Sequence, residues 1–120
     1  MQVGEAMTVR AETIGPGDAL RDAARKMRDI GIGALPVCDG DRLVGMLTDR
    51  DIVVRSIAAG VAPDAGRVRD AMTPQVIWCF DDEDIQRAAE LMQQRAVRRV
   101  MVLDRGKRLV GMLSVDDLAI

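Results

Sequence analysis

A repeated hexapeptide limits what this chain can fold into more than any other feature. The sequence RLVGML occupies Arg42–Leu47 and returns unchanged at Arg108–Leu113, 66 positions later. Ala-Met-Thr at residues 6–8 likewise returns at residues 71–73. At the same offset of 65, four apolar residues of the first copy match four of the second: Leu20, Ala23, Ala24 and Met27 fall on Ile85, Ala88, Ala89 and Met92. A chain of 120 residues with this pattern is a duplicated unit of about 60 residues. We divide it into residues 1–60 and 61–120, with residues 58–67 joining the halves.

Each copy predicts the same order of secondary-structure elements. The matched apolar residues lie at i, i+3, i+4 and i+7, which is one face of a helix. Two short apolar runs follow the helix, at 34–38 and 43–47 in the first copy, and a tight polar turn between them predicts a hairpin. The second copy repeats this with runs at 100–103 and 109–113.

The flanks of these segments complete the predicted repeat. A short strand is expected before the first helix, near residues 13–14 and 76–79, and a second helix is expected to begin at Thr48 or Ser114. Asp18 is a plausible N-cap of the first helix. In the second copy, residues 81–84 are all acidic and complement the positive end of the matching helix. The order is strand, helix, two strands, helix, so the fold class is α/β (α+β) with two repeats that share one core.

Composition excludes several classes of protein. Apolar residues make up 48% and charged residues 30%, as in ordinary globular proteins, and the net charge is −2. Because the chain is slightly acidic and only 2% aromatic, neither a polyanion-binding field nor a stacking platform for nucleic acid is expected. No apolar run approaches the roughly 20 residues that span a bilayer. The N-terminus does not resemble a secretion signal, so we expect a cytoplasmic protein without a membrane partner.

The residue inventory also argues against an enzyme. The chain contains no histidine and only two cysteines, Cys38 and Cys79, each within an apolar run. Common zinc sites and Ser-His or Cys-His nucleophile pairs are therefore not expected. Both cysteines are expected to be unreactive core thiols, with no metal and no catalytic cofactor.

The residues after the repeated hexapeptide allow two interpretations. Thr48 and Asp51, like Ser114 and Asp117, have the spacing of a capping box, in which each side chain satisfies a backbone N–H at a helix start. The same start of a helix also attracts an anion, since its N–H groups point outward and a hydroxyl can donate to a phosphate. A carboxylate one turn later can accept hydrogen bonds from a ribose diol. Both interpretations can hold together.

At these residues the chain resembles CBS domains, named after cystathionine β-synthase. The segments GALPVCDGDRLVGMLTDRDIV and VRRVMVLDRGKRLVGMLSVDDLA carry the resemblance, which covers about residues 3–120. It implies two βαββα repeats packed about a pseudo-twofold axis, an arrangement called a Bateman module, and often a homodimer. It also implies an adenine-containing ligand such as AMP, ADP, ATP, NAD(H) or S-adenosylmethionine, bound for regulation and not for catalysis.

The resemblance further implies two ligand clefts, each built from both repeats. In the stronger cleft, Thr48 would approach the phosphate and Asp51 the ribose hydroxyls. Arginines would balance the phosphate charge, and backbone near Val97 would face adenine. The residues expected in this cleft are Ala34, Leu35, Pro36, Met46, Thr48, Arg50, Asp51, Val76, Trp78, Val97, Arg98 and Arg99. The weaker cleft is expected to combine Thr13, Ile32, Gly33, Ala34, Met112, Ser114, Asp116 and Asp117.

Differences between the copies rank the two clefts. Arg50 at the first helix start is matched by Asp116 at the second, and an acid beside a phosphate disfavours binding. Trp78 could stack on adenine, or it could belong to the core or a dimer interface. Arg98 and Arg99 are adjacent on a strand and would point to opposite faces, so one of them could face water alone.

The sequence therefore predicts a regulatory module that binds an adenine nucleotide between its repeats. The alternative is a protein-interaction or assembly module whose clefts are vestigial, with the Ser/Thr-x-x-Asp pairs acting only as caps. The sequence identifies neither the particular ligand nor the downstream protein partner.

Overall fold

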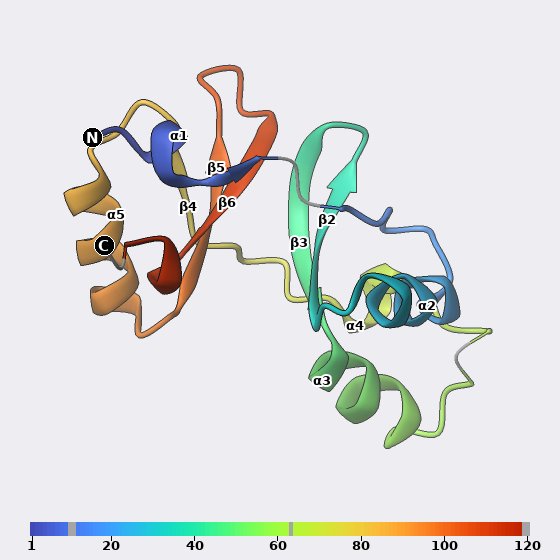
Figure 1. Ribbon diagram of the computed structural model, residues 1–120. Helices are drawn as coiled ribbons and strands as arrows, with labels where there is room; N and C mark the ends of the chain where they lie inside the picture. The colour runs from blue at the N-terminus through green and yellow to red at the C-terminus, as the bar shows by residue number, and fades with distance from the viewer. Residues whose placement is uncertain (10–11, 63, 119–120) are drawn as a thin grey trace. The chain divides into compact units, whose positions relative to one another are not determined.

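The computed structural model describes residues 1–9, 12–62 and 64–118, and these residues form two compact units (Figure 1). Unit 1 comprises Met1–Ala11 and Val76–Ile120, and unit 2 comprises Glu12–Gln75. Each unit contains the helices and strands of one repeat together with a short segment from the start of the other repeat.

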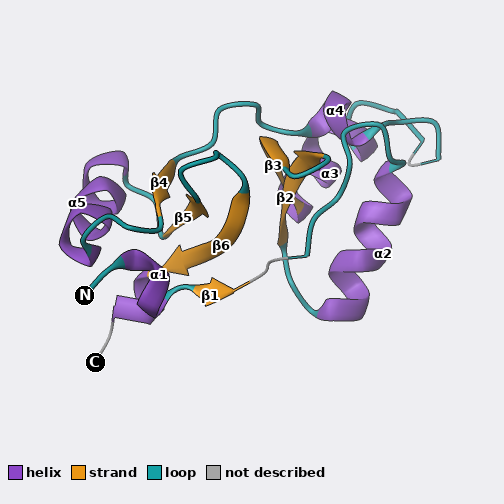
Figure 2. Cartoon of the chain, turned by 90° about the horizontal axis from the view of Figure 1, so that it is seen from above, coloured by secondary structure: helices purple, strands orange, loops and turns teal. Residues whose placement is uncertain are grey.

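Unit 2 is built around a hairpin of two strands. Strand β2 (Ala34–Asp39) pairs antiparallel with β3 (Arg42–Thr48), with Ala34 opposite Thr48 and a register shift between Val37 and Cys38. The helical segments of unit 2 are α2 (Leu20–Ile30), α3 (Asp49–Ile52), the π-helix η1 (Val53–Ile57) and α4 (Val68–Ala71). Figure 2 shows α2 as the long helix of this unit.

Unit 1 contains a four-stranded sheet in the order β1-β6-β5-β4 (Figure 2). Strands β5 and β6 form the hairpin, β4 is parallel to β5, and β1 is antiparallel to β6. The strands are β1 (Thr8–Val9), β4 (Trp78–Phe80), β5 (Arg99–Leu103) and β6 (Leu109–Ser114). The helices are α1 (Val3–Ala6), α5 (Ile85–Arg95) and the 3-10 helix η2 (Val115–Leu118).

The predicted order of elements is confirmed, with two local differences. Both helices of 11 residues and both hairpins occur where the apolar pattern predicts them. The strand expected near residues 13–14 is reduced to a single parallel bridge, between Ile14 and Val37. The prediction of Asp18 as the N-cap of α2 is wrong, because Ala19 occupies the N-cap position and makes no side-chain hydrogen bond there. The Asp18 carboxylate instead accepts a hydrogen bond from Gly15 N–H at 2.8 Å.

The short segment at the start of each repeat packs with the remainder of the other repeat. The start of the first repeat, with α1 and β1, belongs to unit 1, whereas α4 from the start of the second repeat belongs to unit 2. In unit 1, β1 adds to the sheet beside β6, and Thr8 lies opposite Met112. In unit 2, Thr73 makes the matching bridge to Met46, with two backbone hydrogen bonds of 2.8 and 2.9 Å. Spatial units and sequence repeats are therefore different divisions of the chain.

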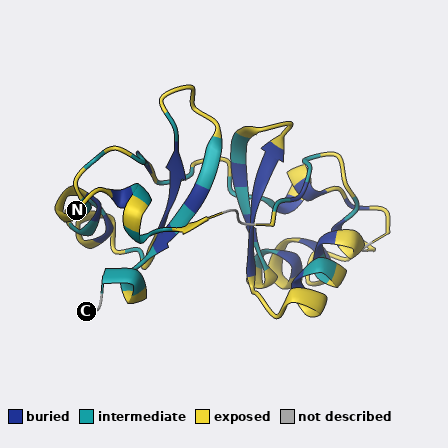
Figure 3. Cartoon of the chain, turned by 45° about the horizontal axis from the view of Figure 1, so that its top comes forward, coloured by how far each residue is buried: buried dark blue, intermediate teal, exposed yellow. Residues whose placement is uncertain are grey.

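The single core that the sequence analysis expected is wrong, because each unit has its own cluster of buried apolar residues (Figure 3). Burial along each long helix follows the helical period. In α2 the buried residues are Leu20, Ala23 and Met27, and in α5 they are Ala88 and Met92. The rest of the unit 2 core is Ile14, Leu35, Val37, Leu47, Ile52, Val68 and Ala71. The rest of the unit 1 core is Val3, Cys79, Val100, Val102 and Leu113. Because Val3 and Val68 are both fully buried, the exchanged segments are part of the cores.

Candidate functional site

At the end of strand β3 in unit 2, Thr48 and Asp51 form two reciprocal hydrogen bonds. Asp51 N–H donates to the Thr48 hydroxyl oxygen at 3.1 Å, and Thr48 N–H donates to Asp51 Oδ2 at 2.9 Å. The predicted capping box is therefore confirmed here. The Thr48 hydroxyl acts as an acceptor in this pair, so its proton remains available to an incoming acceptor such as a phosphate oxygen. The second carboxylate oxygen of Asp51 likewise remains available to a hydroxyl donor.

Backbone of the preceding strand lies directly beside this pair. Asp49 N–H donates to the carbonyl of Gly33 at 2.9 Å, and Ala34 lies opposite Thr48 in the hairpin. A Cβ atom at Gly33 would lie 3.0 Å from Asp49 Oδ2. The absence of a side chain at Gly33 therefore lets the Asp49 carboxylate approach the backbone at this end of the hairpin. A hydroxyl and two carboxylates, those of Thr48, Asp49 and Asp51, thus occur within four consecutive residues.

Two charged residues of unit 2 that contact predicted site residues were missed by the sequence analysis. The carboxylate of Asp49 stands against Gly33 and also accepts a hydrogen bond from Arg50 N–H at 2.8 Å. Lys26 on α2 donates from Nζ to the carbonyl of Thr13 at 2.7 Å. The signal for Asp49 was present, since the second copy has Val115 at this place and only the first has an acid. Lys26 gave no such signal, because its contact is made across the fold.

The other predicted residues of unit 2 line the hairpin or its edge. Leu35 and Pro36 are buried in β2, and Pro36 lies opposite Met46. Thr13 is half-buried and Ile32 is exposed at 37%. Arg50 is exposed at the start of α3. Unit 2 thus collects Thr13, Ile32, Gly33, Ala34, Leu35, Pro36, Met46, Thr48, Arg50 and Asp51.

The corresponding pair in unit 1 has a different hydrogen-bond arrangement. Ser114 N–H donates to Asp117 Oδ2 at 2.8 Å, as in the first copy. The Ser114 hydroxyl, however, also donates to the same oxygen at 3.3 Å. Its proton is therefore engaged within the protein, unlike that of Thr48. The ranking of the two sites stays a prediction.

Arginines of unit 1 lie beside Ser114. Arg99 is opposite Ser114 in the β5–β6 hairpin, and the carbonyl of Arg98 accepts a hydrogen bond from Val115 N–H at 2.9 Å. The Arg98 guanidinium lies 3.9 Å from the Asp116 carboxylate, with both side chains largely exposed. Asp116 therefore offsets part of the positive charge at this end of the sheet, although an exposed pair of this kind stabilises little.

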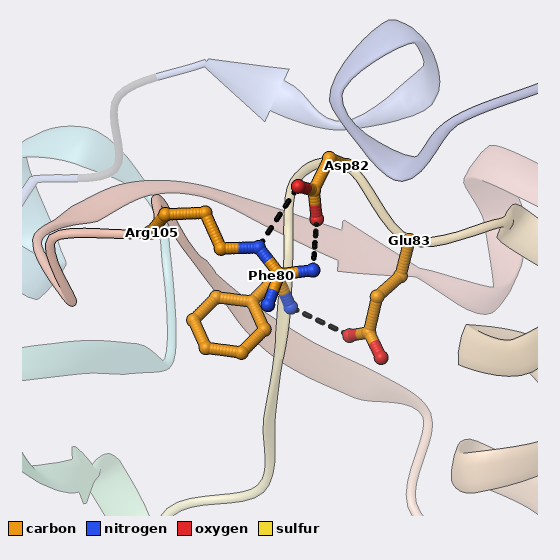
Figure 4. Close-up of polar contacts among 4 residues, drawn as sticks. All are labelled: Phe80, Asp82, Glu83 and Arg105. Atoms are coloured by element: carbon orange, nitrogen blue, oxygen red, sulfur yellow. Dashed lines mark hydrogen bonds and ion pairs between the residues drawn. The ribbon is translucent and has the colours of Figure 1, made fainter.

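Trp78 occupies strand β4 and makes an aromatic contact within unit 1. Its ring meets Phe80 edge to face, with centroids 4.9 Å apart. The guanidinium of Arg105 lies 4.0 Å from the Phe80 ring centroid and makes two hydrogen bonds of 2.8 Å with the Asp82 carboxylate (Figure 4). The tip of the β5–β6 turn is thereby fastened to the segment between β4 and α5. Trp78 stays 37% exposed beside this cluster.

The remaining predicted residues also belong to unit 1, so each predicted cleft draws on both units. Unit 1 holds Val76, Trp78, Val97, Arg98, Arg99, Met112, Ser114, Asp116 and Asp117. The grouping of Thr48 with Val97–Arg99, and of Ser114 with Thr13 and Gly33, stays a prediction. Within single units the described contacts instead join Thr48 to Ala34 and Asp49 to Gly33, and Ser114 to Arg99 and Val115 to Arg98.

Both cysteines are buried, as expected for core thiols. Burial raises the pKa of the Cys79 thiol to about 11, and the nearby Glu83 carboxylate adds to the effect. Burial likewise raises the pKa of Cys38, with a smaller contribution from Asp41. Both thiols are therefore neutral near pH 7, the form that is a poor nucleophile and a poor metal ligand.

No group of three or more potential metal ligands occurs within residues 1–9, 12–62 and 64–118. Over the same residues, none of the helices combines the length and the hydropathy of a membrane-spanning helix.

The duplicated fold and the paired Ser/Thr-x-x-Asp positions define a tandem repeat module, and the chain belongs to the CBS domain family. The family model matches twice, over residues 3–57 and 68–120. Hypoxic response protein 1 of Mycobacterium tuberculosis is 39% identical over 114 residues, which cover 94% of this chain and 79% of that protein.

Solved structures agree with this assignment. The crystal structure of Hypoxic Response Protein I with two coordinated zinc ions superposes with a TM-score of 0.87 at 37% identity, covering 99% of this chain and 97% of the other. CBSX2 in complex with AMP gives 0.81 at 26% identity, with coverage of 98% and 92%. The hexameric CBS-CP12 protein from bloom-forming cyanobacteria gives 0.77 at 30% identity, with coverage of 98% and 70%. The present chain has no histidine, and of its two cysteines Cys38 lies in unit 2 and Cys79 in unit 1.

Proposed function

We propose that this chain is a regulatory module that binds an adenine nucleotide, with the stronger binding at Thr48 and Asp51. The observation that carries the proposal is the geometry at the end of β3. The Thr48 hydroxyl accepts one hydrogen bond and can donate its own proton, and Asp51 uses one carboxylate oxygen for the cap and leaves the other for a ligand. These are groups that recognise a phosphate and a ribose diol. The AMP complex of CBSX2, a protein of the same fold, supports this class of ligand.

The roles of the remaining predicted residues follow from this proposal. Arg50, Arg98 and Arg99 would balance the phosphate charge, backbone near Val97 would face adenine, and Met46 and Val76 would form apolar walls. The weaker site at Ser114 and Asp117 would bind the same class of ligand less tightly, because Asp116 brings a negative charge close to it. AMP, ADP, ATP and NAD(H) share the chemistry that these groups recognise. We further propose that the chain regulates and does not catalyse, acts in the cytoplasm, forms a homodimer and signals to a separate downstream protein.

A second function is supported by one specific observation. The Thr48–Asp51 pair is fully explained as a capping box, and the Ser114–Asp117 pair satisfies the backbone in a related way. A module that only assembles proteins would keep these pairs for helix capping and would bind no nucleotide. The two functions therefore differ in their response to added ligand.

A thermal-shift series separates them. AMP, ADP, ATP, NADH and S-adenosylmethionine are added in turn to the wild type, Asp51→Ala and Asp117→Ala. A ligand that binds only the folded chain stabilises it by about 2.7 kcal/mol at a hundredfold excess over its dissociation constant. We expect Asp51→Ala to lose most of this stabilisation and Asp117→Ala to keep most of it.

Asp70→Ala is the matched control for lost capping. Asp70 accepts a hydrogen bond from Arg67 N–H at 3.0 Å at the start of α4, so its removal costs a similar cap elsewhere in unit 2. This variant should be less stable and keep the full ligand response. A full response in Asp51→Ala with loss in Asp117→Ala would reverse the ranking of the sites. No response of the wild type to any of the five compounds would favour the assembly module.

A further inference from the structure

The eight methionines of this chain differ widely in exposure. Met1 is 65% exposed. Three methionines are buried, with exposed fractions of 6% or less: Met27, Met92 and Met101. The other four are half-buried: Met7, Met46, Met72 and Met112. Among these four, Met7 packs against the core of unit 1 and Met72 against the core of unit 2.

The sulfur atoms of Met7 and Met72 fill equivalent places in the two units. In unit 2, the Met72 sulfur lies 2.8 Å from the position that a Cβ atom on Gly45 would take, and the Thr73 carbonyl oxygen lies 2.9 Å from it. In unit 1, the Met7 sulfur lies 2.6 Å from the corresponding position at Gly111. Each thioether therefore occupies the space left by a missing side chain in the hexapeptide of the other repeat.

An oxygen atom added to such a sulfur would destabilise the contact. Met46 N–H donates to the Thr73 carbonyl at 2.9 Å, and Thr73 N–H donates to the Met46 carbonyl at 2.8 Å, so both backbone donors of this bridge are already used. A sulfoxide oxygen is an acceptor, as is the Thr73 carbonyl oxygen beside it. An acceptor without a donor in a half-buried place costs free energy, and the added atom also enlarges a side chain that is in close contact.

The places of the methionines determine what their oxidation would change. Oxidation depends on exposure, so a peroxide reaches Met1 readily and Met101 slowly. A sulfoxide at Met1 would meet water and leave the cores intact. Met7 and Met72 combine partial exposure with contacts to a core, so oxidation there is both accessible and destabilising.

We infer that Met7 and Met72 are oxidation sites, at which hydrogen peroxide converts the thioether to a sulfoxide and loosens each Ala-Met-Thr segment from the hexapeptide of the other repeat. The sulfur lone pair attacks one peroxide oxygen, the O–O bond breaks and an S–O bond forms. The other oxygen leaves as hydroxide and takes the proton of the transferred hydroxyl, so the products are the sulfoxide and water. The sulfur loses two electrons, and the peroxide gains them. The stability of both units thereby responds to a peroxide, independently of nucleotide binding and of any partner chain.

Peroxide treatment of the wild type gives the first test. Mass spectrometry of its peptides measures the oxidation rate of each methionine, and we expect Met7 and Met72 to react about tenfold faster than Met101, or more. As these sulfoxides accumulate, the melting temperature should fall by about 4 °C or more. Hydrogen exchange should become faster at the Met46 and Thr73 amides, which bridge β3 to the segment that carries Met72.

Leucine substitutions separate oxidation at these two sites from oxidation elsewhere. Leucine has a volume close to that of methionine and has no sulfur, so Met7→Leu/Met72→Leu should keep its melting temperature after the same treatment. Met27→Leu/Met92→Leu is the matched control, since it also changes one methionine at equivalent places of each repeat, and it should show the full loss of the wild type. Cys38 and Cys79 are present in every variant, so their oxidation cannot account for a difference.

Enzymatic reduction provides a test that requires no variant. Methionine sulfoxide reductases A and B, with dithiothreitol as the electron donor, should return the treated wild type to its original melting temperature. The inference is overturned if Met7 and Met72 oxidise no faster than Met101, or if a wild type that carries both sulfoxides melts as before. It is also overturned by an equal loss in Met7→Leu/Met72→Leu, or by a loss that reduction does not reverse.

Discussion

A Cβ atom on Gly45 would lie 2.8 Å from the sulfur of Met72, closer than such atoms approach in folded proteins. The same relationship recurs in unit 1, where a Cβ on Gly111 would lie 2.6 Å from the sulfur of Met7. Glycine and methionine in each contact come from different repeats. The hexapeptide of each repeat thus packs against the Ala-Met-Thr segment of the other repeat.

Replacing either glycine by alanine should therefore destabilise the fold. In Gly45→Ala the new methyl group would meet the carbonyl of Thr73 at 2.9 Å as well as the sulfur, and a backbone atom cannot move aside cheaply. We expect a loss of about 1–3 kcal/mol in the free energy of unfolding, as for other overpacked sites, and a similar loss for Gly111→Ala. Urea denaturation followed by circular dichroism measures both. Gly17→Ala is the control, since the nearest atom there is 3.6 Å away on the flexible Arg69 side chain, and its effect should stay within about 0.5 kcal/mol.

The N-caps of the two long helices predict a stabilising substitution. Asp84 caps α5 by accepting a hydrogen bond from Gln86 N–H at 2.8 Å, and its backbone angles are φ −67 and ψ 139. Ala19 caps α2 with nearly the same angles, φ −69 and ψ 143, but has no side chain that can accept. Ala19→Asp should therefore raise the free energy of unfolding by about 1 kcal/mol, and Asp84→Ala should lower it by a similar amount. Thermal melts of both variants test this. An unchanged Ala19→Asp beside a weakened Asp84→Ala would contradict the equivalence of the two caps.

The contact between Arg105 and Asp82 predicts a titration effect. A hydrogen bond from Arg105, aided by its charge, holds the pKa of the Asp82 carboxyl below its ordinary value of 3.8. A carboxyl whose pKa is lowered by folding stabilises the folded state above its unfolded-state pKa, and this contribution is lost as the pH falls through the folded-state pKa. In Arg105→Ala the pKa of Asp82 should rise toward 3.8, as followed by NMR titration of its carboxyl carbon. Arg108→Ala should leave Asp82 unchanged, because Arg108 pairs with Asp104.

The buried thiol of Cys79 predicts a loss of stability at alkaline pH. Its pKa is raised from 9.0 to about 11 by burial, so the unfolded chain loses this proton at lower pH than the folded chain. The resulting stabilisation is complete below pH 9 and disappears between pH 9 and 11, by an amount on the order of 2 kcal/mol. Urea denaturation at several pH values should show a steeper alkaline decline for the wild type than for Cys79→Ala. The chain contains no tyrosine, so no phenol titrates in this window. Equal slopes for the two proteins would contradict the raised pKa.

Local patterns predicted the regular elements well. The apolar residues Leu20, Ala23 and Met27 identified α2, because residues three and four apart lie on one face of a helix in any fold. The hairpins were equally clear, since a polar turn between two apolar runs leaves few alternatives. The capping box at Thr48 follows from residue type and spacing alone. Asp18 was assigned wrongly because the helix start was displaced by one residue, which moved the capping position to Ala19.

The duplicated sequence by itself determined the family, the repeated elements and the pairs Thr48–Asp51 and Ser114–Asp117, because these depend on residues close together in the chain. Tertiary structure alone decided that each Ala-Met-Thr segment packs on the other repeat, that Asp49 stands against Gly33, and that Lys26 reaches the carbonyl of Thr13. Tertiary structure also decided that the Ser114 hydroxyl donates a hydrogen bond to Asp117, whereas the Thr48 hydroxyl accepts one from Asp51 N–H. These contacts depend on how closely separate segments approach one another and in which direction their donors point, and packing of the whole core sets both.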